Sequence, residues 1–155
     1  MASLGSIVRY SDKLLRTSQI QDFDGAVNGL QVENSGKVTR IAAAVDASLA
    51  TVRLAAAARA DLLIVHHGLF WGPSHPWTGR RYELIRFLLN HDLAIYSSHL
   101  PLDAHPRLGN NAQICQALGF RRRQRFFFDH GGFIGFKTQA RIPRKQLYAR
   151  FARVV

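Results

Sequence analysis

The sequence has few of the features that mark secreted and membrane proteins. Cys115 is its single cysteine, so no disulfide can form within one chain, and no run of 18 or more apolar residues is present to span a bilayer. The opening stretch, MASLGSIVRYSDKLL, lacks the basic patch, apolar block and small-residue cleavage site of a secretory signal. These absences predict a cytoplasmic protein with no membrane partner.

Acidic side chains are also scarce. Ten Asp and Glu face 21 Lys and Arg, which gives a net charge of +11 and favours an anionic ligand or nucleic acid as a partner. The densest basic block consists of four arginines directly before three phenylalanines: Arg121, Arg122, Arg123, Arg125 and Phe126, Phe127, Phe128. Two interpretations are open: basic side chains beside aromatic stacking surfaces, or a solvated turn that leads into a buried strand.

Apolar periodicity alternates between helix and strand along the 155 residues, which is long enough for about one domain. This alternation predicts a single α/β domain over residues 1–155, with a mostly parallel sheet flanked by helices. Expected helices cover 7–20, 49–60, 82–89, 110–118 and a segment from 144 onward; expected strands cover 38–45, 62–65, 93–96, 126–128 and 133–136. Asn110 and Asn111 are the expected caps of the helix over 110–118.

Two groups of metal-binding side chains follow neighbouring strands of this predicted sheet. His66 and His67 come directly after the strand over 62–65, and His99 and Asp103 follow the strand over 93–96. Because ligands gather beyond the carboxyl ends of strands in open α/β sheets, both groups are expected at one sheet edge. Imidazole nitrogen and carboxylate oxygen suit Zn, Mn, Fe or Ni.

The adjacency of the two histidines favours a two-ion site. Successive strand side chains point to opposite faces, so two adjacent rings on a regular strand do not converge easily on one ion. Where the backbone turns, the rings of His66 and His67 can diverge toward two ions, and Asp103 can complete one ion's ligands or bridge both. The competing interpretation is that each histidine is a hydrogen-bonded structural residue, which is the expectation for the isolated histidines at positions 75, 91, 105 and 130.

Three motifs in order resemble the Nif-three-like family of dinuclear-metal-centre proteins, whose members are often labelled GTP cyclohydrolase 1 type 2 homologues. They are NGLQVEN over 28–34, VHHGLFWG over 65–72 and YSSHLPLDAHPRLGNNAQICQALG over 96–119. The likeness is nearest to the bacterial branch that carries HHG and HLPLDAHP.

The resemblance implies a set of roles for these residues. It makes His66 and His67 ligands of two different divalent ions and Asp103 the carboxylate ligand of one of them. It makes His99 a residue that lines the site or orients Asp103. It also implies the α/β fold of the family and a homo-oligomer, expected to be a hexamer with its metal sites facing an interior cavity.

One family motif has no counterpart in this sequence. Family members carry a later GHxxxE motif that supplies a histidine and a bridging glutamate, whereas Glu83 is the last glutamate here. The sequence therefore corresponds to the N-terminal portion of a longer family member without the C-terminal ligand segment. Three explanations are open: a truncated or frameshifted product, a second polypeptide that supplies the remaining ligands, or fewer and weaker ions. The helix that begins near the C-terminus favours the first.

A metal-dependent hydrolase of unknown substrate is the leading functional prediction, because paired ions activate water and polarise substrate oxygens. The sequence contains no P-loop or other nucleotide motif. One alternative is a non-catalytic, metal-binding regulatory or chaperone-like module that binds nucleic acid or protein. The other is a non-functional truncated product.

Overall fold

The structure is a computed structural model that describes residues 2–154. The chain divides into two compact units, residues 1–101 and 102–155, and each is described by itself. The prediction of a single domain over 1–155 stays a prediction. Among the helices of residues 2–154, none is both long and apolar enough to cross a bilayer.

The first unit is built on a four-stranded sheet in the order β2 (Gly29–Val32), β6 (Ala94–Ser97), β5 (Leu62–His67) and β4 (Ile41–Asp46). The last three strands are parallel, and β2 pairs antiparallel with β6 at one edge. A two-stranded ribbon, β1 (Ala2–Ser3) with β3 (Lys37–Val38), accompanies the sheet. The predicted α/β fold with a mostly parallel sheet is therefore confirmed.

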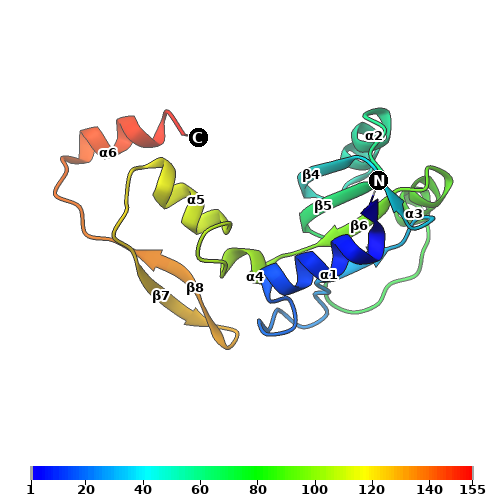
Figure 1. Cartoon of the computed structure of the whole chain (residues 1–155), viewed down its shortest axis with the longest axis horizontal. Coiled ribbons are helices and arrows are strands. Elements are labelled where there is room, and N and C mark those ends of the chain that lie inside the picture. The colour runs from blue at the N-terminus through cyan, green and yellow to red at the C-terminus, as the bar shows by residue number, and fades with distance from the viewer. Residues whose placement is uncertain (1, 155) are drawn as a thin grey trace. The chain divides into compact units, whose positions relative to one another are not determined.

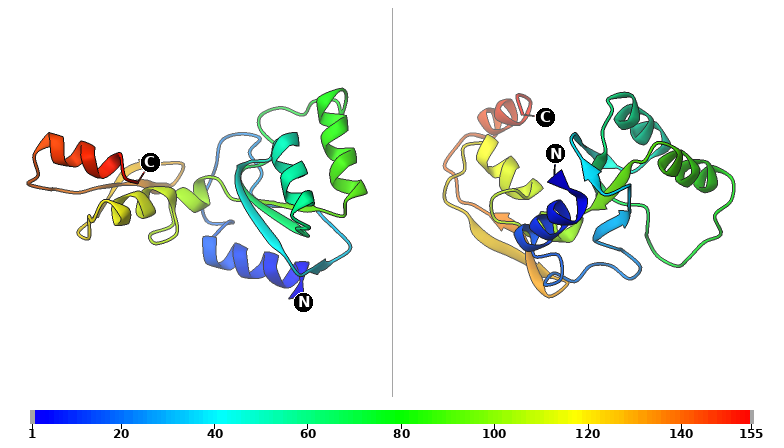
Figure 2. Two further views of the ribbon diagram at one scale, coloured as in Figure 1. Left: turned by 90° about the horizontal axis from the view of Figure 1, so that it is seen from above. Right: turned by 45° about the vertical axis from the view of Figure 1, so that its right-hand side comes forward.

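Helices cover both faces of this sheet, as Figures 1 and 2 show. Helices α2 (Leu49–Ala57) and α3 (Arg80–Asn90) lie on one face, and α1 (Leu4–Leu15) lies on the other. The strands alternate accordingly: Leu63 and Ile95 belong to the core cluster that contains Val52 of α2, whereas Tyr96 belongs to the cluster that contains Leu4 of α1. This two-sided burial makes β5 and β6 almost continuously apolar.

Two elements differ in their boundaries from the sequence prediction because of individual residues. Helix α1 begins at residue 4 because Ser3 caps it, and it ends at residue 15 because Arg16 adopts a left-handed conformation with a φ of 56°. The expected strand over 38–45 is broken into β3 and β4. At the break, the Asp61 carboxylate accepts hydrogen bonds from the Thr39 backbone and hydroxyl and from the Arg40 backbone.

The second unit holds α5 (Asn110–Ala117), a hairpin of β7 (Gln124–Asp129) and β8 (Gly132–Lys137), and α6 (Arg144–Phe151). The short helix α4 (Leu100–Asp103) lies across the boundary between the units. The residue that caps α5 is Gly109, without a side-chain cap, so the expected capping by Asn110 and Asn111 is wrong. The Asn111 amide instead donates to the Ile134 carbonyl of β8, at 2.6 Å.

Candidate metal centre

Three histidines of the first unit lie at the carboxyl edge of the sheet. Strand β5 extends through His67, two residues beyond its expected end, and His67 pairs with Asp46 of β4 while Val65 pairs with Ser97 of β6. His99 follows β6 by two residues. The predicted meeting of His66, His67 and His99 at one edge of a parallel sheet is confirmed.

The three imidazoles form a cluster. Ring centroids are 4.6 Å apart for His66 and His67, 4.9 Å for His66 and His99, and 5.6 Å for His67 and His99. Candidate ligand atoms of the three side chains all lie within 4.8 Å of one another. The adjacent rings of His66 and His67 thus stay together with a tilt of 38°, and their assignment to two separate ions stays a prediction.

Each imidazole is oriented by a protein acceptor at Nδ1. His66 Nδ1 bonds the Ser98 carbonyl at 3.0 Å, His67 Nδ1 bonds Asp46 Oδ1 at 2.7 Å, and His99 Nδ1 bonds Asp22 Oδ1 at 2.8 Å. A carbonyl or a carboxylate can only accept, so in all three rings Nδ1 carries the proton and donates. In the neutral ring, Nε2 is then the unprotonated nitrogen, and this is the tautomer that metal-ligating histidines use.

Asp22 has the most developed environment of these acceptors, and its side chain is only 5% exposed. Besides His99, its oxygens accept from the Asn28 side chain at 2.7 Å and from the backbone N–H groups of Phe23 and Leu100. Burial raises the pKa of the Asp22 carboxyl, but these four hydrogen bonds outweigh it and hold the pKa below its ordinary value of 3.8. Asp22 is therefore a carboxylate that faces His99 Nδ1 in charged form.

The loop after the histidines is held against β2. Leu69 N–H donates to the Gln31 side-chain oxygen at 2.7 Å, and a Cβ at Gly68 would overlap the same Gln31 amide. Trp71 donates from its indole nitrogen to the Gly68 carbonyl, and its ring meets the His99 ring edge-on at 4.7 Å. The glycine of the HHG motif thus lets the loop approach the Gln31 amide closely, and a larger residue would displace that amide.

Asp103, the predicted carboxylate ligand, belongs to the second unit. Its carboxylate accepts a hydrogen bond from the Asn110 side chain at 3.0 Å. Its coordination of an ion beside His66 and His67 stays a prediction.

The donor set fits a divalent transition ion in kind and in scale. An ion bonds imidazole nitrogen at about 2.0–2.1 Å, and paired ions lie about 3.5–4 Å apart. The candidate ligand atoms lie within 4.8 Å of one another. This separation is short enough for the atoms to bind one such ion or two neighbouring ions. Among the described residues of the first unit, His66, His67 and His99 therefore form a group that could hold a metal ion.

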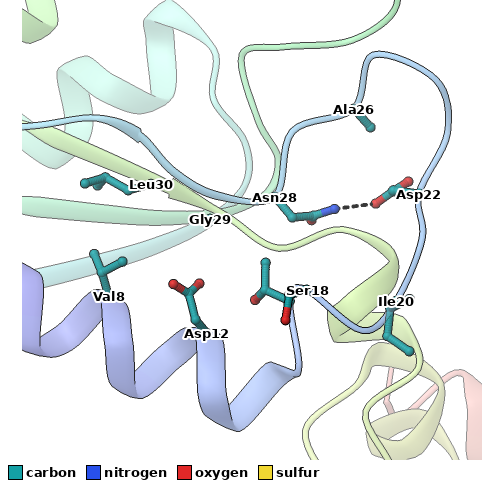
Figure 3. Close-up of a pocket in the computed structure, with 10 residues that line it drawn as sticks. Val8, Asp12, Ser18, Ile20, Asp22, Ala26, Asn28, Gly29 and Leu30 are labelled. Carbon is teal, nitrogen blue, oxygen red and sulfur yellow. Dashed lines mark hydrogen bonds between the residues drawn. The ribbon is translucent and has the colours of Figure 1, made fainter.

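A pocket of about 620 Å³ lies next to Asp22, between α1 and the segment that enters β2 (Figure 3). Asp12, Asp22 and Asn28 line it, and the dashed line in Figure 3 marks the bond from Asn28 to Asp22. The adjacent Tyr96 is 1% exposed and donates from its hydroxyl to Asp12 at 2.8 Å. Burial, followed by the neighbouring Asp12, raises the pKa of Tyr96 well above its ordinary value.

The structure of the segment from Arg121 to Phe128 disagrees with the interpretation that the basic block leads into a buried strand. Phe126, Phe127 and Phe128 of β7 are 51%, 55% and 64% exposed, so the expected buried strand is wrong. Arg123 is engaged within its own unit, where it donates to the Ala112 carbonyl at 2.7 Å.

Asp22, Asp46 and Trp71 were missed as site residues in the sequence. Asp46 ends a strand that is parallel to β5, and this position was a usable signal. Asp22 lies in a loop 77 residues from His99, and nothing in its spacing connects the two. Trp71 is part of the VHHGLFWG motif, and its aromatic type next to a histidine pair was the available signal.

Together, fold and cluster define an α/β protein whose mostly parallel sheet presents three imidazoles suited to a divalent ion. Residues 2–153 match the model of the family described as Duf34/NIF3 (NGG1p interacting factor 3), and the chain belongs to this family. It is similar to a GTP cyclohydrolase 1 type 2 homolog of Deinococcus radiodurans, with 46% identity over 139 residues that cover 90% of this chain and 51% of the relative. A homolog of the same name from Archaeoglobus fulgidus is 43% identical, over 88% of this chain and 55% of the relative.

Solved structures agree with this assignment. A crystal structure of a Thermus thermophilus protein matches 98% of this chain and 61% of its own, with a TM-score of 0.87 and 35% identity. Reduced HcgD from Methanocaldococcus jannaschii matches 79% of this chain and 49% of its own, with a TM-score of 0.68 and 25% identity. The chain thus spans about half the length of the curated relatives it matches, and the predicted Nif-three-like fold is confirmed.

Proposed function

We propose that this chain supplies the histidine side of a divalent-metal centre in a metal-dependent hydrolase. The observation that carries the proposal is the cluster of His66, His67 and His99, in which every Nδ1 is bonded to a protein acceptor. Candidate ligand atoms of these three side chains lie within 4.8 Å of one another at the ligand-binding edge of the sheet. His99, expected only to line the site, enters the proposal as a ligand.

The remaining roles are proposed on the family resemblance. Asp103 is proposed as the carboxylate ligand, and two ions are proposed for the complete centre, with Zn, Mn, Fe or Ni as candidates. A bound divalent ion would act as a Lewis acid that polarises a substrate bond and activates water for attack. Asp22 and Asp46 hold two of the imidazoles in the ligating tautomer and raise their basicity.

Equilibrium dialysis of the purified chain against each of the four ions, with metal analysis, tests the centre. Wild-type protein is expected to retain ion, and His66→Ala, His67→Ala and His99→Ala are each expected to weaken retention by about tenfold or more. His91→Gln is the matched control, because His91 is exposed, lies outside the cluster and bonds the Phe87 carbonyl of α3 through its ring. Equal retention by His67→Ala and wild type would refute the centre.

Hydrolysis is tested with the same variants. The printed name of the relatives suggests GTP as the first substrate to assay, followed by a panel of phosphate esters and cyclic amides. Turnover that requires added ion and disappears in His67→Ala and Asp103→Ala is expected for a hydrolase. Retained metal with no turnover on any substrate would instead support a binding module.

The second candidate function is a non-catalytic module that binds an anionic partner such as nucleic acid. The observation that favours it is the exposed aromatic strand β7 beside the basic block, in a chain of net charge +11. Affinity for single-stranded nucleic acid that falls steeply with salt and is lost on changing Arg121, Arg122 and Arg125 to Gln would support it. Affinity that is independent of these arginines would remove the candidate.

A homo-oligomer, expected to be a hexamer, is proposed on the family resemblance. Ile41 and Val45 of the edge strand β4 are 48% and 59% exposed and offer apolar surface for such an assembly. Sedimentation equilibrium gives the mass directly, and a monomer across the micromolar range would refute the assembly.

A further inference from the structure

A second pocket of the first unit lies beside the histidine cluster. Its volume is about 360 Å³, within the usual range for small-ligand sites. Trp71 and Trp77, the two tryptophans of the chain, both line it and are 37% and 45% exposed. Exposed tryptophans that share one concave surface are unusual for side chains that bury so much apolar area when packed.

The aromatic lining connects this pocket to the proposed metal centre. Trp71 contacts the His99 ring edge-on at 4.7 Å and the His67 ring at 5.8 Å, and it also lines the pocket. Phe70 and Trp77 meet edge-to-face at 5.9 Å on the same lining. Indole rings offer flat surfaces on which heteroaromatic rings stack.

The polar part of the lining is suited to an anion. Arg81, in the first turn of α3, lines the pocket together with His75 and Ser74. Among the described residues that line it, none is an aspartate or a glutamate. A guanidinium with hydroxyl and imidazole donors, free of a competing carboxylate on the lining, is the usual recognition set for phosphate or carboxylate.

Contacts within the protein fix the shape of the pocket independently of any ligand. Gly25 has a φ of 79°, and a Cβ there would overlap the Gly72 backbone, so the two loops touch through glycine. The indole N–H of Trp71 is anchored on the Gly68 carbonyl at 2.9 Å. Two contacting loops and one fixed indole reduce the ordering cost of binding.

We propose that this pocket binds a planar heteroaromatic ring that carries an anionic group, the chemistry of a mononucleotide. The ring stacks on the tryptophan lining, and Arg81 binds the anionic group. The part of the proposal that makes this ligand a substrate rests on the proposed metal centre, because Trp71 places the ring next to His67 and His99. Binding itself does not depend on metal.

Intrinsic tryptophan fluorescence reports directly on the pocket, since both tryptophans of the chain line it. The probe is adenosine 5′-monophosphate, with adenosine and ribose 5-phosphate as half-ligands that lack the anion or the ring. The monophosphate is expected to quench saturably, and each half-ligand is expected to bind at least about tenfold more weakly. Equal affinity for ribose 5-phosphate and the monophosphate would overturn the stacking role.

Variants with matched neighbours test the two contacts. Arg81→Gln is expected to weaken the monophosphate about tenfold, whereas Arg80→Gln, an exposed neighbour on α3, leaves the affinity unchanged. Trp77→Leu is expected to weaken it about fivefold or more, with Tyr82→Leu as the exposed aromatic control. Equal losses of affinity for the two members of either pair would overturn the proposal. It would also be overturned if a long oligonucleotide bound more tightly than expected from its number of nucleotides, each bound as one independent monophosphate.

Titrations with chelator and with His67→Ala separate this inference from the proposed function. Monophosphate binding that persists while metal retention is lost supports the pocket and is independent of the centre. Metal retention without monophosphate binding overturns the pocket and leaves the centre in place.

Discussion

Replacement of Asp22 by asparagine is the sharpest test of how the fold holds the histidine cluster. The exchange keeps the shape of the side chain and removes only the charge and one acceptor. Asp22 Oδ1 accepts from His99 Nδ1 and Phe23 N–H, and Oδ2 accepts from the Asn28 side chain and Leu100 N–H. An asparagine has a single oxygen, so it can serve only one of these two pairs.

The magnitude follows from the pair that is lost. If the new oxygen faces His99, its amide nitrogen meets two donors, from Asn28 and Leu100. Asn28 cannot rescue the contact by flipping, because its own oxygen accepts from His99 N–H at 2.7 Å. A buried donor left without an acceptor costs about 1–3 kcal/mol, so Asp22→Asn is expected to lose about 2–4 kcal/mol of unfolding free energy. Zinc affinity is expected to fall about tenfold or more.

Urea unfolding in the presence of chelator measures the first quantity, and competition with a chromophoric chelator measures the second. Asp24→Asn is the matched control, since Asp24 is two residues away and exposed, and it is expected to behave like wild type. An Asp22→Asn midpoint equal to that of Asp24→Asn would refute the reasoning from buried hydrogen bonds. Unchanged zinc affinity beside the expected loss of stability would refute the positioning role alone.

Other contacts lead to three further predictions. The side chain of Asp46 is 64% exposed, so Asp46→Asn is expected to change the unfolding free energy by less than about 0.5 kcal/mol. The same substitution is expected to weaken zinc binding several-fold in the chelator competition. A loss of stability as large as that of Asp22→Asn would contradict the argument from burial. Tyr96→Phe removes the donor to Asp12 and is expected to cost about 1–3 kcal/mol in urea unfolding, and a neutral result would show that solvent replaces the hydroxyl. Hydrogen bonds from the Thr39 hydroxyl and from the backbone of residues 39 and 40 hold the pKa of Asp61 below its ordinary value of 3.8. The folded state therefore binds this proton less readily than the unfolded state, and the stabilisation is complete above about pH 4–5 and declines as the pH falls through the folded pKa. The difference in unfolding free energy between wild type and Asp61→Asn should shrink on acidification, and a constant difference between pH 3 and 7 would exclude the carboxylate as its source.

The proposed centre and the proposed pocket differ in how they depend on the rest of the family's fold. The pocket is lined wholly by residues between 25 and 81, so its test is complete on this chain. By family resemblance, the proposed centre would also use Asp103, which belongs to the second compact unit, and ligands of a motif that this sequence does not contain. Metal retention by this chain therefore measures only the contribution of the ligands that the chain itself contains.

Periodicity was a good guide to the elements that are buried on both sides. The helices over 49–57 and 80–90 and the strands β5 and β6 lie where their apolar patterns indicated. It failed where one polar side chain redirects the backbone. Asp61 breaks the strand expected over 38–45, and Arg16 ends α1 early by adopting a left-handed conformation. Such events depend on a partner far along the chain or on a single dihedral, and neither leaves a periodic trace.

By itself, the sequence determined the α/β class, the family and the histidines that form the cluster, because residue type, order and position relative to strand ends are local properties. Only the tertiary structure decided which acceptors orient those histidines. Asp22 and Asp46 reach their rings across 77 and 21 residues, and the ligating tautomer depends on those bonds. The shared lining of Trp71, Trp77 and Arg81 was likewise decided by loop packing, since glycine contacts between distant loops create a pocket that no linear pattern encodes.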